Sequence, residues 1–246
     1  MVENAEINAT EDEIIDGQIT IGEEKSKAIA HKNSSLKRLD MSFNQHIELL
    51  EYKKSHLLAY WIEDFANYHD SERNFNSSSL KTFKRGDIIK VNLGFNVGNE
   101  LGGLHYCIVL DKKDNPYSGT LNVIPLSSIK EGKTYDSNTC VNLGDELYSL
   151  LLAKYIKESK VFDKEIQDLS TTTSPDKTKA LLRKFEYLQK INDEITRMKH
   201  GSIAYIHQIT TISKQRIFKT PILSGIKISN ESLDLIDKKI IKMFTK

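Results

Sequence analysis

The spacing of the apolar residues changes near residue 85, and this change constrains the fold more than any other feature of the chain. Upstream, apolar residues recur every three, four or seven positions, as in a long amphipathic helix; they are Leu36, Leu39, Phe43, Ile47, Leu50, Leu57, Trp61 and Phe65. Downstream they alternate, at Ile89, Val91, Leu93 and Phe95, as on a half-buried strand. The sequence therefore predicts a chain that begins as helix, possibly broken, and continues as sheet. The helical stripe needs a partner, which can be the chain's own body, a second subunit or another protein.

Further strands are predicted after the first. Apolar runs at 107–110 and 120–126 follow it at close spacing, and strand character returns at 202–212 and 215–222. Pro125 cannot donate a ladder hydrogen bond, so its strand is expected to lie at an edge or to end there. Short strands joined by tight turns predict a small antiparallel barrel or sandwich.

Helical patterns interrupt and close this sheet. Two amphipathic stretches, beginning near Gly144 and Asp176, predict a helical hairpin inserted at about 141–199. The chain ends in a short amphipathic helix; the residues expected on its buried face are Leu233, Ile236, Ile240 and Phe244. The predicted class is α+β.

Charge is divided unevenly along the chain. Residues 1–24 hold eight acidic residues and no Lys or Arg, which gives a local charge of −8. Because the whole chain carries +1, residues 25–246 carry about +9. This composition favours a disordered, solvated tail over 1–34. A basic body also suits a nucleic-acid partner, for which the tail could compete. The expected organisation is an acidic tail at 1–34, a helical extension at 35–80, and a body at 81–246.

Several classes of protein are not expected. No apolar run approaches membrane-spanning length, and the start of the chain is acidic where a signal peptide would be basic. Cys107 and Cys140 make no disulfide framework and read as packing residues, so the cytoplasm is the expected location. The histidines and cysteines lack metal-ligand spacing, and no phosphate-loop motif is present, so no cofactor is expected.

Four blocks together resemble a known family. RGDIIKVNLGFNVGNELGG, CIVLD, YSGTLNVIPLSS and IHQITTISKQRI, ahead of a terminal helix, are similar in order and spacing to the MazF/PemK family of bacterial toxins. The matching residues are 85–130 and 201–246. The resemblance implies an SH3-like β-barrel of the MazF/PemK/CcdB kind with a C-terminal helix, usually a homodimer. The N-terminal helix and the inserted hairpin have no counterpart in short members of the family.

The resemblance also implies a function. Family members are mRNA interferases: they cut single-stranded RNA without metal, the ribose 2′-OH attacking the adjacent phosphate to leave 2′,3′-cyclic phosphate and 5′-OH ends. An antitoxin protein normally covers the RNA groove. Such chemistry needs a base for the 2′ proton, an acid for the leaving oxygen and donors for the phosphate.

The family positions map onto this chain only in part. Ser127 stands at the family's catalytic Ser/Thr, His105 where an arginine usually contacts the phosphate, and Tyr205 and His207 where PemK-like members place an Arg and an Asp. Two histidines titrating near neutral pH suit this chemistry. The expected catalytic set is therefore His105 as acid/base, Ser127 as phosphate ligand, and His207 as second acid/base or its orienter. The alternative for His105 is a rim residue satisfied by a backbone carbonyl.

A wider set of residues is expected to contact substrate: Arg85, Asn99, Glu100, Gly102, Gly103, Ser128, Tyr205, Gln208, Lys214 and Arg216. The cations among them can equally be surface charges, and Glu100 can order its loop through backbone N–H groups. Two other functions stay open. One is a CcdB-like inhibitor that binds gyrase through the C-terminal helix, and the other is a catalytically silent RNA-binding module. The acidic tail and first helix could also cover the groove in place of an antitoxin.

Overall fold

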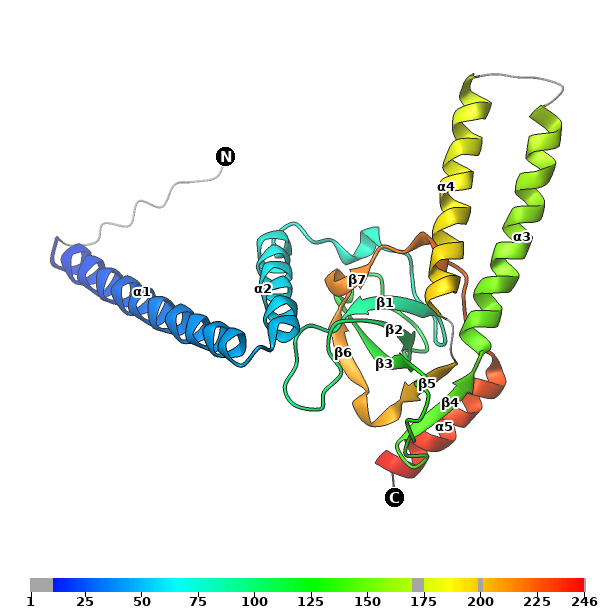
Figure 1. Ribbon diagram of the computed structural model, residues 1–246. Helices are drawn as coiled ribbons and strands as arrows, with labels where there is room; N and C mark the ends of the chain where they lie inside the picture. Colours follow the sequence, from blue (N-terminus) through cyan, green and yellow to red (C-terminus); the bar gives the residue numbers. More distant parts are fainter. Residues whose placement is uncertain (1–10, 170–174, 199–200, 246) are drawn as a thin grey trace. The chain divides into compact units, whose positions relative to one another are not determined.

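The computed structural model describes residues 11–169, 175–198 and 201–245 (Figure 1). The chain divides into two compact units, Met1–Tyr60 and Trp61–Lys246, which are described separately.

The first unit is helical. Helix α1 spans Glu11–Glu48. A turn at Leu50, whose φ is 59°, precedes α2, which spans Tyr52–Glu72 and so continues into the second unit from Trp61. The break expected within the long helix therefore lies at residues 49–51. Residues 11–34, which were expected to form a disordered tail, lie within α1; residues 1–10 lie outside the described range. Six of the eight acidic residues of α1 precede its first lysine, Lys25, an order that suits the helix dipole, and Lys27 pairs with Glu23 one turn earlier at 2.8 Å.

The second unit is built on an antiparallel sheet. Its strands are β1 (Ile88–Asn92), β2 (Leu104–Val109), β3 (Thr120–Ser128), β4 (Cys140–Gly144), β5 (Ser202–Tyr205), β6 (Thr210–Ser213) and β7 (Ile217–Phe218). Their order is β4-β5-β3-β2-β1-β7, and β6 also pairs with β3. The mixed α and β class is confirmed. The described strands form an open sheet with β4 and β7 at its ends, so a closed SH3-like barrel is not confirmed.

Two details of the sheet differ from expectation. β4 lies at the start of the stretch that was expected to form the helical insertion. Its five residues are too few to show a period of two, so the sequence pattern does not indicate this strand. Pro125 pairs with Cys107 at the end of the β2–β3 ladder, yet β3 continues to Ser128 by pairing with β5. Pro125 therefore ends a ladder but does not end the strand or lie at an edge.

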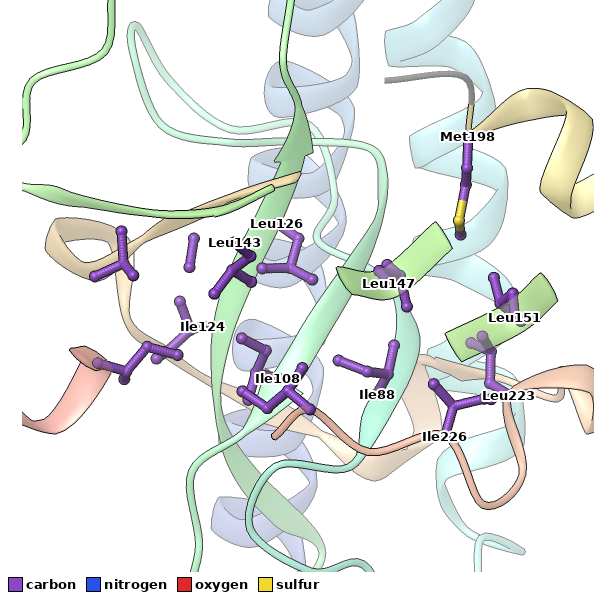
Figure 2. Close-up of a cluster of buried hydrophobic side chains, with 14 of the residues drawn as sticks. Ile88, Ile108, Ile124, Leu126, Leu143, Leu147, Leu151, Met198, Leu223 and Ile226 are labelled. Carbon is purple, nitrogen blue, oxygen red and sulfur yellow. The ribbon is translucent and has the colours of Figure 1, made fainter. Parts of the chain in front are cut away.

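The sheet has two apolar faces, as alternation requires. One face carries Ile88, Ile108, Ile124 and Leu126, which belong to the larger core shown in Figure 2. The opposite face carries a smaller buried cluster, formed by Phe83, Ile89, Val91, Leu93, Cys107, Val109, Leu121, Val123 and Ile212.

Helices complete the larger core. α3 (Glu146–Leu169) and α4 (Pro175–Arg197) lie side by side (Figure 1) and are inserted between β4 and β5, which pair with each other. The hairpin contributes Leu147 and Leu151 near its start (Figure 2), and Ile191 and Ile195 near its end. The insertion is thus as expected, although it occupies residues 146–197.

A buried polar contact joins the hairpin to the sheet. Glu194 of α4 accepts from Lys90 Nζ of β1 at 2.6 Å and from the Tyr106 hydroxyl of β2. Since Lys90 and Tyr106 are direct partners across the β1–β2 ladder, one carboxylate fixes α4 to two strands.

The last helix, α5, spans Asn230–Phe244. Ser229 caps its N-terminus, because the Ser229 hydroxyl accepts a hydrogen bond from the Ser232 N–H at 3.2 Å. Leu233 and Ile236 are buried as expected, and Ile240 packs partly against the core. Phe244 is wrongly placed by the predicted stripe, because it is 59% exposed at the end of the helix.

Candidate active site

An irregularity in the sheet creates the site. Leu126 of β3 faces Ala204 of β5, whereas Val123, three residues earlier in β3, faces Thr210 of β6, six residues later in the returning chain. The three surplus residues form a 3-10 turn, η2 (Ile206–Gln208). Ile206 is fully buried, and the next two side chains line a groove.

The groove has a volume of about 750 Å³. It lies between the loop that joins β1 to β2, the turn η2 and the segment just before β7. Seven of its lining residues are polar: Asn96, Asn99, Glu100, His207, Gln208, Thr210 and Arg216. Five of these belong to the expected site, whereas Asn96 and Thr210 were not expected there.

Gln208 joins the two sides of the groove. Its Oε1 accepts from the Leu101 N–H at 2.7 Å, and its Nε2 donates to the Asn99 carbonyl at 3.0 Å. Because a backbone N–H can only donate and a carbonyl can only accept, these partners fix which way the amide points. The glycine-rich loop is therefore held against η2.

The His207 ring has a defined tautomer. Nδ1 lies 3.2 Å from the Thr139 carbonyl, so Nδ1 carries the proton in the neutral ring. Nε2 is then the acceptor, and it lies 3.4 Å from the Gln208 amide nitrogen. A groove-lining imidazole with its lone pair on Nε2 is able to take a proton from a bound hydroxyl.

His105 is anchored in the same way. Its Nδ1 lies 2.7 Å from the Leu126 carbonyl, which leaves Nε2 as the acceptor in the neutral ring. The carbonyl contact that the rim interpretation requires is present, and His105 does not line the groove.

Alternation nevertheless places other expected residues near the groove. Cys107 pairs with the groove-lining Pro125, so His105 and Ser127, two positions away on each strand, share that face of the sheet. Ser127 in turn pairs with Ile203 of β5, which puts Tyr205 on this face too. Burial raises the pKa of Tyr205, and a hydrogen bond with the Ser127 side chain opposes that rise.

Arg216 is the cation of the groove. Its Nε donates to the Asn92 carbonyl at 2.8 Å, and its guanidinium lies 5.3 Å from the centre of the Trp61 ring. Burial lowers the pKa of this guanidinium, while Tyr68 and Cys107 act in the opposite sense. Among the residues that the structure describes, no carboxylate forms an ion pair with it.

The glycines of the loop close it on itself. A Cβ on Gly102 would lie 2.7 Å from the Gly94 carbonyl oxygen, which also accepts from the Gly103 N–H at 2.6 Å. Glu100 lines the groove and accepts from the Val97 N–H at 3.3 Å, as the loop-ordering interpretation predicts. Close backbone approach is therefore needed within the loop, whatever binds beside it.

Two of the expected phosphate ligands, Lys214 and Arg85, pair with carboxylates of the chain itself. Lys214 is 2% exposed, and its Nζ donates to Asp114 at 2.6 Å and to the Asn115 carbonyl at 3.0 Å, so it has a structural role. Arg85 pairs with Asp237 of α5 and donates to the Leu110 carbonyl. Ser128 and Arg85 do not line the groove.

Three further contributors to the site were not expected from the sequence. Thr139 and Asn92 act through their carbonyl oxygens, for which no side-chain pattern exists. Trp61 stood out only as a member of the helical stripe, although it is the single tryptophan of the chain.

In the described ranges, no group of three His, Cys, Asp or Glu side chains is arranged to hold a metal ion. None of the helices described is both long and apolar enough to cross a membrane. Cys107 and Cys140 are buried free thiols, as expected of packing residues.

Comparison with known proteins bears on these assignments. No curated protein matches the chain. The family model of PemK-like, MazF-like toxins of type II toxin–antitoxin systems matches residues 84–185, from the start of the sheet into α4. The match contains the glycine-rich loop, His105 and Ser127, while His207, Gln208 and Arg216 lie beyond it. The resemblance predicted from the sequence is thus confirmed over residues 84–185, and α1, α2 and α5 lie outside the matched segment.

Proposed function

We propose that this protein is a toxin-type endoribonuclease that cleaves single-stranded RNA without a metal ion. The observation that carries this proposal is that two groups line the same groove. One is an imidazole with a fixed tautomer, and the other is an arginine that forms no ion pair with a carboxylate of the described residues. The family match over residues 84–185 supports a toxin of this type. As in the family, the cytoplasm is the expected location and an antitoxin the expected partner. A homodimer is the expected assembly.

The chemistry assigns a role to each group. His207 Nε2 accepts the proton of the ribose 2′-OH as the 2′ oxygen attacks the adjacent phosphorus. The bond from phosphorus to the 5′ oxygen then breaks, leaving a 2′,3′-cyclic phosphate, and an acid protonates the departing oxygen. His105 in its protonated form is the candidate acid.

The phosphate carries additional negative charge as the attack proceeds, and donors must hold it. Arg216 presents a planar guanidinium suited to paired contacts with phosphate oxygens. The Ser127 hydroxyl is the second candidate ligand. Asn99, Glu100, Gln208 and Tyr205 remain candidates for contacting bases or riboses.

The test uses 5′-end-labelled single-stranded RNA in EDTA with wild type, His207→Ala, His105→Ala and the control His31→Ala, whose residue is exposed on α1. Wild type should give 5′-OH and 2′,3′-cyclic phosphate ends, and a 2′-deoxy substrate should stay intact. His207→Ala should lose about 10²–10⁴-fold in rate, and His31→Ala should cut normally.

The same series separates the rival functions. Uncut RNA that still binds the folded protein would indicate the silent RNA-binding module. Neither cutting nor binding would leave the gyrase inhibitor as the function to test. Full activity in His207→Ala would refute the assignment of the base.

A further inference from the structure

Helix α2, which precedes the segment matched by the family model, places Trp61 against the glycine-rich loop and against Arg216, which lines the groove. The Trp61 indole lies against Gly94, where a Cβ would come within 2.9 Å of the ring. Gly94 has a φ of 86° and so needs glycine for its backbone as well. The guanidinium of Arg216 lies over the same indole, 5.3 Å from the ring centre. Trp61 therefore contacts both the glycine-rich loop and the cation of the groove.

Hydrogen bonds fix this part of α2 beside Arg216. Asp64 accepts from Asn92 Nδ2 at 2.7 Å, and Asn92 is the residue whose carbonyl holds Arg216. Gln215, the neighbour of Arg216 in the chain, donates to the Tyr68 carbonyl at 2.8 Å and to the Ser71 hydroxyl at 2.6 Å. The contacts of α2 thus converge on the residues that position Arg216.

The charge of Arg216 is compensated differently from that of other cations on the sheet. Lys90, Lys214 and Arg85 each pair with a carboxylate. Arg216, which is also partly buried, has one carbonyl and the face of an indole. A π face holds a cation in place without neutralising it, so the guanidinium keeps its attraction for an anion that enters the groove.

We propose that Trp61 is a positioning residue for the RNA site: by stacking on Arg216 it holds the guanidinium toward the phosphate of a bound single strand. This inference rests on the proposed function for the identity of the ligand. In this proposal α2 supports RNA binding in the groove, in contrast to the hypothesis that the N-terminal helical region covers the groove and excludes RNA.

The experiment measures binding and cutting separately on the full-length protein. The binding probe is a fluorescein-labelled RNA oligonucleotide with 2′-O-methyl groups at every ribose, which cannot attack itself, followed by anisotropy over a salt series. The variants are Trp61→Phe, Trp61→Met, Arg216→Met and the double Trp61→Met/Arg216→Met. Lys219→Met serves as a charge-matched control, because Lys219 is exposed and lies outside the groove lining. Trp61→Met keeps apolar volume against Gly94 but has no π face, and circular dichroism verifies folding.

The expected RNA affinities of wild type, the two single variants and the double variant form a double-mutant cycle. Trp61→Met should bind roughly fivefold more weakly than wild type, and Trp61→Phe, which keeps a ring, should recover most of that loss. Arg216→Met should lower the magnitude of the salt slope by about 0.7, as for one lost phosphate contact on a single strand. Trp61→Met should then add nothing in the Arg216→Met background, since its effect acts through that guanidinium.

Other outcomes overturn the inference. Equal losses from Trp61→Met with and without Arg216 would make Trp61 merely structural, and stronger binding by Trp61→Met would make α2 a cover. A salt slope reduced as much by Lys219→Met would remove the special role of Arg216. Cleavage of natural RNA is measured separately from binding. If binding follows the predicted pattern but no RNA is cut, the nuclease function is refuted and the role of Trp61 in RNA binding stands. If RNA is cut but Trp61→Met binds as wild type does, the nuclease function stands and the role of Trp61 is refuted.

Discussion

The carboxylate that fixes α4 to the sheet offers a direct test of what holds the second unit together. Glu194→Leu would leave Lys90 without its partner, and the two side chains are only 9% and 15% exposed in the ion pair. Breaking a buried pair from one side costs about 3–5 kcal/mol, because the remaining charge stays desolvated. The Tyr106 ring, 5.2 Å from the Lys90 ammonium, offers some compensation, so we expect about 3 kcal/mol.

The assay is urea unfolding followed by the fluorescence of Trp61, the single tryptophan, which lies in the second unit. With a slope of about 2 kcal/mol per M, the midpoint of unfolding should fall by about 1.5 M. The double variant Lys90→Met/Glu194→Leu should cost only about 1 kcal/mol, the price of the lost Tyr106 hydrogen bond.

A more exposed pair provides the control. Lys184 and Glu165 lie 2.7 Å apart between α4 and α3, with Glu165 45% exposed, so Lys184→Met should cost less than about 1 kcal/mol. The reasoning fails if Glu194→Leu costs no more than Lys184→Met, or if the double variant costs the sum of its two single changes.

Two further predictions concern the loop and the core. Gly102→Ala should destabilise the protein by about 1–3 kcal/mol in the same unfolding assay and reduce RNA binding, because the added Cβ meets the Gly94 carbonyl at 2.7 Å; Gly119→Ala, with nothing within 4 Å, should be tolerated. Burial raises the pKa of the Cys107 thiol from 9.0 to about 12, so native Cys107 should resist iodoacetamide at pH 8. Between these two values the folded state holds a proton that the unfolded state has lost, so the free energy of unfolding should fall above pH 9 by about 1.4 kcal/mol per pH unit. Cys107→Ala should flatten that slope, and an unchanged slope would contradict the assignment.

The elements that could be predicted from sequence are those in which burial repeats with a regular period. From Ile89 to Asn92, β1 alternates buried and half-buried positions, and α5 buries Leu233 and Ile236 one turn apart, so the sequence indicates both elements. β4 was missed because a five-residue strand beside a helix has no period of its own. α1 was missed over residues 11–34 because its composition resembles a solvated tail, whereas the order of its charges suits a helix.

The site was harder, because partners decide what a side chain does. Lys214 and Arg216 are two residues apart and share the same expectation, yet one meets Asp114 in the interior and the other lines the groove. That difference comes from long-range contacts that no local pattern contains. The anchoring of His207 was equally hidden, since it depends on the Thr139 carbonyl, 68 residues away in sequence.

The order of the site residues along the chain has a consequence for synthesis. A ribosome that has made the first two hundred residues has produced Trp61, the glycine-rich loop and the helical hairpin, but none of His207, Gln208 and Arg216. The groove forms only after β5 and β6 have been synthesised and have paired with β3, and after β7 has paired with β1. On the proposed function, a nascent chain therefore cannot cut the message from which it is being translated until residues 207–216 have left the ribosome.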